Sequence, residues 1–283
     1  MAVLMLSGCD AALLNPKGAI GVQEKELIIT AVVLMLIVVI PTILMTIYFS
    51  FKYRASNTDE EYAPEWSHST KIELMVWIIP VIIIILLGTI TWRTTHELEP
   101  SKPLVHDAEP VNIEVVALDW KWLFIYPEQH IATVNHVVFP KDVPVSFTIT
   151  ADKVMNSFFI PRLGGQMYAM PGMASRLHLI ANHEGDFKGI SSGFSGDGFS
   201  HMKFTATATA DVDSFNQWVE KVKSSPDTLA DLSAYKALAQ PSIDAPVTYY
   251  SKVVPELFAN IVTQYPGSMN ASFDKACLVE DEG

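Results

Sequence analysis

The stretch Leu27–Phe51, LIITAVVLMLIVVIPTILMTIYFSF, decides what kind of protein this chain is. It has no charged residue over 25 positions, enough for an α-helix to cross a hydrocarbon layer about 30 Å thick. A second uncharged run, Leu74–Trp92, reads LMVWIIPVIIIILLGTITW over 19 positions. Neither run has the polar face expected of a helix at the surface of a soluble domain. The sequence therefore predicts two transmembrane helices, at residues 27–51 and 73–93.

The amino terminus carries a candidate export signal. Leu6-Ser7-Gly8-Cys9 resembles a bacterial lipobox, although the usual basic region before it is missing and a chance match is the alternative. This pattern predicts a signal peptide remnant at residues 1–8, a lipidated Cys9, and an exported segment at residues 9–26. An exported Cys9 makes the loop 52–72 cytoplasmic and everything after the second span periplasmic, in a bacterial inner membrane.

The composition excludes some partners and cross-links. The formal net charge is −12, and from Val111 onward 12 Lys and Arg stand against 19 Asp and Glu. Nucleic acid needs clustered positive charge, so it is not an expected partner. The two cysteines, Cys9 and Cys277, lie at opposite ends of the chain, which argues against a structural disulfide.

The pattern of apolar residues changes after a linker at residues 94–110. Short alternating segments separated by Gly and Pro predict a β-sandwich at residues 111–209. The predicted strands include Val111–Val116, Val145–Thr150, Arg176–Ile180 and Met202–Thr207. Residues 210–283 predict a helical extension and tail, with apolar helix faces at Asp211–Lys223, Asp227–Leu238 and Val254–Gln264.

Three segments of the predicted sandwich carry a resemblance to a known family. They are the aromatic strand Ala117–Trp122, the segment Met155–Pro161, and the loop Gly189–Met202. In order and spacing they resemble the second subunit of haem–copper oxidases. The resemblance implies two transmembrane helices in a hairpin, then a cupredoxin-like β-sandwich and a helical extension.

The resemblance also shows which metal ligands are missing. In copper-bearing relatives, two thiolates, two imidazoles, a thioether and a backbone carbonyl hold two copper ions. At the matching positions this chain has Asn156, Ser191, Gly193, Ser195, Phe199 and Met202. A serine hydroxyl cannot replace a bridging thiolate, and no cysteine lies between Val111 and Ala276. We therefore expect a sandwich without copper, with His178, His183 and His201 as ordinary histidines and not as a weak imidazole site.

Loss of this centre is typical of cytochrome o-type ubiquinol oxidases. The resemblance implies a subunit I that holds haem b, haem o and one copper, two small subunits III and IV, and ubiquinol as the substrate of the complex. It implies oxygen reduction to water with proton pumping, no cytochrome c as partner, and no catalytic centre in this chain. The alternatives are a membrane lipoprotein scaffold without an oxidase role and, against the missing cysteines, a cytochrome c oxidase subunit II.

Two further features have competing interpretations. Glu73, at the start of the second span, is either an acid favoured by a helix amino terminus or, as the resemblance implies, a residue near a proton-channel entrance. Trp120 and Trp122 are expected to share one face of a strand, in a packing or subunit-contact role.

Overall fold

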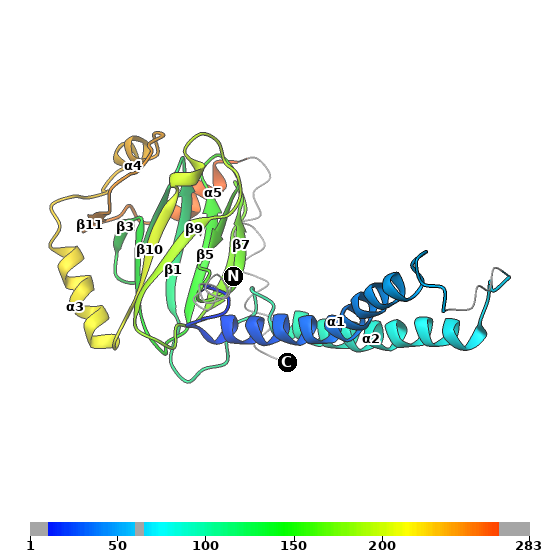
Figure 1. Ribbon diagram of the computed structural model, residues 1–283. Helices are drawn as coiled ribbons and strands as arrows, with labels where there is room; N and C mark the ends of the chain where they lie inside the picture. Colours follow the sequence, from blue (N-terminus) through cyan, green and yellow to red (C-terminus); the bar gives the residue numbers. More distant parts are fainter. Residues whose placement is uncertain (1–10, 60–64, 266–283) are drawn as a thin grey trace. The chain divides into compact units, whose positions relative to one another are not determined.

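The computed structural model describes residues 11–59 and 65–265, so Cys9 and Cys277 lie outside the described residues. The chain divides into two compact units (Figure 1). One is Lys25–Glu99. The other combines the residues before Lys25 with those from Pro100 onward.

The first unit contains two helices that are long and apolar enough to cross a membrane, α1 (Ala19–Lys52) and α2 (Thr70–Glu97). Both run past the predicted spans, which followed the uncharged runs, and the helices continue into the charged residues on either side. Threonine and serine hydroxyls in α1 donate to the carbonyl four residues earlier, as from Thr42 to Val38 and from Thr46 to Thr42. Polar groups satisfied within one helix are what a hydrocarbon environment demands.

The second unit is a sandwich of two β-sheets. The six-stranded sheet has the order β11 (Thr248–Tyr250), β3 (Ile131–Val134), β2 (Lys121–Tyr126), β1 (Val111–Leu118), β5 (Val145–Ala151) and β8 (Ser175–Leu179). The five-stranded sheet has the order β4 (His136–Pro140), β10 (Lys203–Thr209), β9 (Gly185–Ser191), β6 (Asn156–Phe159) and β7 (Gln166–Ala169). The predicted sandwich is confirmed.

Aromatic side chains fill the space between the sheets. Phe158 stacks on Phe204 at 5.0 Å between ring centroids, and Trp122 meets the edge of Phe158 at 5.3 Å. Trp122 and Phe158 are fully buried, and each such side chain stabilises the fold by roughly 1.5–3 kcal/mol. A Cβ on Gly189 would lie 2.1 Å from Phe204, so β9 needs a glycine where it passes this ring.

The segment before α1 is bound to the sandwich. The Lys17 amide donates to the Arg162 carbonyl, and the Asn182 amide donates to the Lys17 carbonyl. A Cβ on Gly18 would lie 2.4 Å from the Ile180 carbonyl oxygen, which explains the glycine at this close approach. No local pattern near residue 17 predicts that this segment belongs to the same compact unit as the sandwich.

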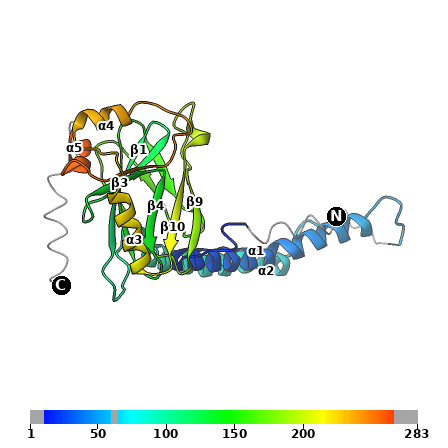
Figure 2. The ribbon, with the colours of Figure 1, turned by 90° about the vertical axis from the view of Figure 1, so that its left-hand side faces the viewer.

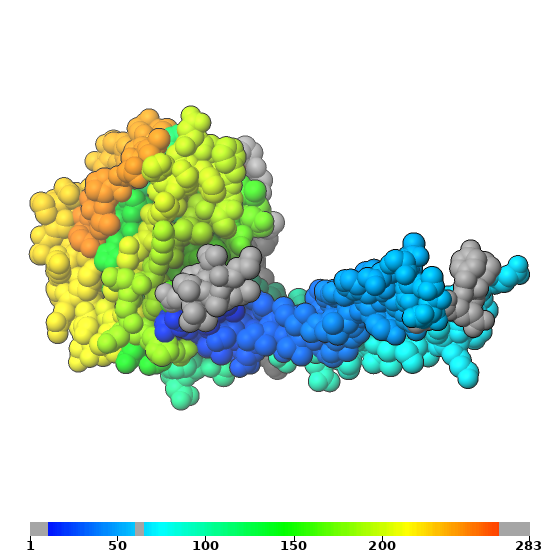
Figure 3. Space-filling view, viewed as in Figure 1, coloured from blue at the N-terminus to red at the C-terminus, as the bar shows by residue number. Residues whose placement is uncertain are grey.

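The residues after β10 form α3 (Val212–Lys223), α4 (Leu232–Leu238) and α5 (Leu257–Thr263). Figure 2 shows α3 beside β4 and β10, and Figure 3 shows the orange segment after α4 lying on the sandwich. Two helices start later than predicted. Leu229 pairs with Val253 in a β-bridge before α4. Glu256 has a left-handed backbone conformation, with φ of 56°, so α5 cannot include it and begins at the next residue.

The extension covers the outer face of the six-stranded sheet with a second hydrophobic cluster. Its buried members from the sheet are Val116, Leu118, Leu123, Ile125, Ala132 and Val134, and those from the extension are Leu229, Tyr235, Ala239, Leu257, Phe258, Ile261 and Val262. Strands with apolar side chains on both faces need such a cover, so the extension is part of the folded domain.

Candidate functional site

Four of the six positions that the family resemblance assigns to copper ligands lie together at one end of the sandwich. Asn156 begins β6 and Ser191 ends β9, and the Ser191 hydroxyl donates to Asn156 Oδ1 at 3.1 Å. The same hydroxyl lies 3.3 Å from the Gly193 carbonyl, and the Ser191 amide donates to the Met202 carbonyl at 3.1 Å. Four of the six positions are therefore joined by hydrogen bonds, with Met202 itself buried.

A second group of polar side chains ties the same loop to β6. The Ser192 hydroxyl lies 2.9 Å from the Ser157 hydroxyl, which also accepts from Gln166 Nε2 at 2.7 Å. The Ser192 amide donates to the Ser157 carbonyl at 3.0 Å. These hydrogen bonds cross-link the loop to the sheet at the end that carries Asn156 and Ser191.

The two remaining positions lie in the loop between β9 and β10. Phe199 begins a short helical turn, η2 (Phe199–His201), and its ring lies 5.7 Å from that of Phe194. The hydroxyl of Ser195 is buried without a hydrogen-bond partner among the described residues. Neither a phenyl ring nor a serine hydroxyl supplies the soft donor that copper requires.

Trp120 contacts the loop between β9 and β10 and does not lie on the strand face where the sequence placed it. It lies in the turn between β1 and β2, with φ of 67°, so the expectation that it shares a strand face with Trp122 is wrong. Its Nε1 donates to the Ser195 carbonyl at 3.0 Å. A Cβ on Gly198 would lie 2.3 Å from its indole, so the ring sits directly on the loop backbone. A positive φ at a bulky residue is uncommon and marks a position fixed by its surroundings.

The histidines of this region differ in their surroundings. His201 Nδ1 lies 3.0 Å from an Asp244 carboxylate oxygen, whereas His178 Nε2 is buried without a hydrogen-bond partner among the described residues. Burial lowers the pKa of His178. Residues 11–59 and 65–265 contain no group of three or more His, Cys, Asp or Glu side chains arranged to hold a metal ion.

Sequence reasoning missed the polar contacts that fix the extension beside this loop. Lys121, nearly fully buried, donates to the Gln240 carbonyl at 2.7 Å and to the Ser242 hydroxyl at 2.5 Å. Burial lowers the pKa of Lys121, and nearby Asp119 opposes that shift. A lysine within the otherwise apolar strand Lys121–Tyr126 was the available signal, because a buried lysine needs partners.

Asp152 provides the second of these contacts. Its carboxylate is buried and accepts from the Tyr235 hydroxyl at 2.7 Å, and Lys153 Nζ lies 3.9 Å away. Burial raises the pKa of Tyr235, and the Asp152 carboxylate adds to the shift. The charge of Asp152 is thus held between the sheet and α4.

Glu73 lies in the first turn of α2, as the sequence predicted. Its carboxylate oxygen lies 2.6 Å from His68 Nδ1, and both side chains are about half exposed. His68 was not singled out from the sequence, since five positions separate it from Glu73 outside any regular element. A carboxylate near a helix amino terminus is favoured by the helix dipole.

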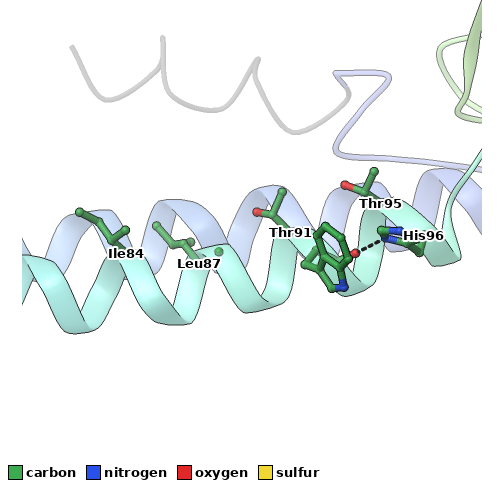
Figure 4. Close-up of a pocket in the computed structure, with 7 residues that line it drawn as sticks. Ile84, Leu87, Thr91, Thr95 and His96 are labelled. Atoms are coloured by element: carbon green, nitrogen blue, oxygen red, sulfur yellow. Dashed lines mark hydrogen bonds between the residues drawn. The ribbon is translucent and has the colours of Figure 1, made fainter.

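Near its carboxyl end, α2 has a shallow hollow, shown in Figure 4. The side chains around it are Ile84, Leu87, Gly88, Thr91, Trp92, Thr95 and His96. His96 Nδ1 lies 2.7 Å from the Trp92 carbonyl oxygen, so this polar group is satisfied within the helix. The mainly apolar lining suits packing against other apolar surfaces.

Two family models match the sandwich and its extension. Residues 106–209 match "Cytochrome C oxidase subunit II, periplasmic domain", and residues 223–269 match "COX Aromatic Rich Motif". Two apolar helices followed by a cupredoxin-like sandwich that matches this periplasmic domain define the class of haem–copper oxidase second subunits.

Curated relatives specify the family within that class. The chain is 58% identical to "Cytochrome bo(3) ubiquinol oxidase subunit 2" of Pseudomonas aeruginosa, over 93% of this chain and 78% of the relative. It is 54% identical to "Ubiquinol oxidase subunit 2" of Acetobacter aceti, over 94% of this chain and 86% of the relative. This protein belongs to the ubiquinol oxidase subunit 2 family.

Proposed function

We propose that this chain is the membrane-anchored subunit II of a ubiquinol oxidase that reduces oxygen to water and pumps protons. Subunit I would hold haem b, haem o and one copper, and subunits III and IV would complete the complex. The supporting observation is a folded copper-site end in which Ser191 hydrogen-bonds to Asn156 where a thiolate and an imidazole would be needed. Electrons would pass from ubiquinol to subunit I without entering this chain, and cytochrome c would have no role.

We propose that the sandwich faces the periplasm and that loop 52–72 faces the cytoplasm. The match of residues 106–209 to a periplasmic domain supports this orientation. An export signal ending at Cys9 would place the amino terminus on the same side, which an even number of spans requires.

An exposed apolar surface beside the copper-site positions supports contact with another subunit. We call Val154, Met155 and Phe194 the loop patch. Their exposed fractions are 43%, 50% and 80%. Met155 precedes Asn156 and Phe194 follows Gly193, and Ser191 hydrogen-bonds to both of those neighbours. Large apolar side chains clustered at a surface mark interaction sites, and subunit I is the partner that we propose here.

The decisive experiment is purification of the complex through a tag on this chain. Mildly solubilised membranes should yield haem together with the chain, oxygen uptake driven by ubiquinol, and no oxidation of reduced cytochrome c. Phe194→Asp should lower the haem recovered, whereas Val105→Asp, at a fully exposed position, should leave it unchanged. A chain that purifies without haem would favour the lipoprotein scaffold instead.

A further inference from the structure

His136 connects the two sheets at the edge where the extension joins the sandwich. It begins β4, the edge strand of the five-stranded sheet, and it faces β11, the edge strand of the six-stranded sheet. Its Nδ1 lies 2.8 Å from the Tyr249 hydroxyl on β11, and its Nε2 lies 2.9 Å from the Thr207 hydroxyl on β10. One imidazole therefore holds an extension residue and a sandwich residue together.

The neighbouring hydrogen bonds determine where the imidazole proton lies. The Thr207 hydroxyl donates to Asp186 Oδ1 at 2.5 Å, so its oxygen is left to accept from His136 Nε2–H. A neutral imidazole then has a lone pair on Nδ1, which accepts from the Tyr249 hydroxyl. The neutral form satisfies every group in the chain Asp186–Thr207–His136–Tyr249.

The surroundings of His136 contain charges of both signs. Trp218 of α3 lies 6.3 Å away with its ring edge toward the imidazole, and Lys221 is on the same helix. Thr205 of β10 pairs with His136 on one side and with Lys188 of β9 on the other, so Lys188 lies two strands away from His136 at the same level of the sheet. Burial lowers the pKa of His136, Asp186 opposes this shift, and Lys221 adds to it.

We propose that His136 is an acid-sensitive latch that holds β11 of the extension against the sandwich. Protonation converts the Nδ1 lone pair into an N–H, so the Tyr249 hydroxyl loses the acceptor that it uses in the neutral state. β11 has only the residues Thr248–Tyr250, which pair with β3 over three positions, and the Ser225 hydroxyl donates to the Tyr249 carbonyl. The bond between Tyr249 and His136 joins this short strand to the other sheet, so its loss weakens the attachment of β11 to the five-stranded sheet.

The direction of the pH effect follows from the folded and unfolded states. Burial keeps the pKa of folded His136 below its ordinary value of 6.5, so the unfolded segment binds the proton more tightly. The latch contributes its full stability above pH 6.5 and loses it as the pH falls toward the lower, folded pKa. If the oxidase releases protons on the side of the membrane that holds the sandwich, the local pH falls and β11 loosens. That consequence rests on the proposed function, whereas the latch itself does not.

Hydrogen–deuterium exchange of the full-length chain in detergent micelles tests the latch. The readout is the protection of Thr248–Tyr250, corrected for the intrinsic exchange rate, at pH 7.5 and pH 5.5. Protection in the unmodified chain should fall by up to about tenfold in total, because pH 5.5 lies one pH unit below the ordinary pKa of 6.5. His136→Gln should keep high protection at both pH values, because an amide can donate to Thr207 and accept from Tyr249. His201→Gln, which changes an exposed histidine, should keep the fall.

Equal protection of the unmodified chain at both pH values would overturn the latch. An unchanged fall in His136→Gln would also overturn it. Tyr249→Phe provides an independent test should His136→Gln fail to fold. This variant should show low protection already at pH 7.5 and little further change at pH 5.5. Protection in Tyr249→Phe equal to that of the unmodified chain would also overturn the latch, whether or not the chain assembles with haem.

Discussion

Among individual residues, Asp152 is a buried polar side chain that depends on a hydrogen-bond donor from the extension. Asp152 is buried on the outer side of the sandwich, and the Tyr235 hydroxyl that it accepts from comes from α4. A buried carboxylate that loses a donor keeps its desolvation penalty, so the pair is a strong test of how the extension is held.

Tyr235→Phe should destabilise the domain by about 1–3 kcal/mol, because it leaves the Asp152 carboxylate short of a donor. Thermal unfolding of the full chain should show a lower midpoint. Tyr250→Phe is the matched control in the same cluster, since the described residues give the Tyr250 hydroxyl no hydrogen bond. Equal midpoints for the two variants would show that the Tyr235 hydroxyl contributes nothing beyond its ring.

Glu73 permits a similar comparison of its two interpretations. If it feeds protons to subunit I, Glu73→Gln should slow ubiquinol oxidation severalfold with unchanged haem content. His68→Gln removes the partner at 2.6 Å but keeps the carboxyl group, so it should turn over normally. Full turnover in Glu73→Gln would favour the role at the helix amino terminus. The measurements are oxygen uptake and the haem spectrum of the purified complex.

Among the secondary-structure elements, α3 and α4 of the extension begin at aspartates that cap their amino termini. Asp211 accepts from the Ser214 amide at the start of α3, and Asp231 accepts from the Ala234 amide at the start of α4. Such caps satisfy amides that have no partner inside the helix. They define the first residue of each helix more sharply than the apolar pattern does.

Asp211→Ala should increase amide exchange in the first turn of α3, whereas Asp213→Ala, inside the helix, should have a smaller effect. Hydrogen bonds from Ser214 lower the pKa of Asp211. The cap therefore keeps its full contribution above the ordinary value of 3.8 and loses it as the pH falls through the folded pKa. Exchange in the variant should be independent of pH in that range, after correction for the intrinsic rate. A pH dependence equal to that of the unmodified chain would contradict this role.

The loops at the end of the sandwich are arranged closely enough to be converted into a metal site. Asn156→His, Ser191→Cys, Gly193→Glu, Ser195→Cys and Phe199→His together should bind about two copper ions with intense thiolate-to-copper absorption. A Cβ at Gly193 would meet the Ser157 side chain at 3.5 Å, an ordinary contact. Ser191→Cys alone should fail, because one thiolate cannot form the paired bridge. A folded but colourless fivefold variant would refute the match of these positions, and metal analysis provides the count.

Across the molecule as a whole, the membrane anchor and the folded domain bury their apolar side chains in different places. The uncharged central runs of α1 and α2 are exposed in the chain by itself and are long and apolar enough to cross a membrane. The sandwich closes around its own core, and the extension covers the remaining apolar face. Attachment to the membrane should therefore be insensitive to changes in the sandwich.

Cys9, outside the described residues, supports a prediction about that attachment. Intact-mass analysis should show a mature chain that begins at Cys9 and carries a diacylglycerol increment. Cys9→Ala should remain in the membrane fraction after alkaline washing, because two spans hold a protein far more firmly than acyl chains do. An unmodified Cys9 would remove the lipoprotein interpretation without affecting the family assignment. Release of Cys9→Ala would contradict the two-span anchor.

Features that depend on composition and local spacing were predictable from the amino-acid sequence. Two uncharged runs of sufficient length predicted α1 and α2, and alternation between turns predicted the sandwich. The absence of cysteine between Val111 and Ala276 is enough to exclude a thiolate-bridged copper pair, whatever the fold of that segment. The matching of positions to copper ligands came instead from the resemblance of two segments to copper-bearing relatives.

The meeting of distant side chains, by contrast, is a property of the three-dimensional fold. Ser191 and Asn156 are 35 positions apart, Tyr235 and Asp152 are 83 apart, and His136 and Tyr249 are 113 apart. Each contact depends on strand order and register, which local periodicity does not specify. Trp120 left its expected strand face because the turn between β1 and β2 falls on it and rotates its ring onto the loop. Long-range packing, and not local propensity, placed these groups.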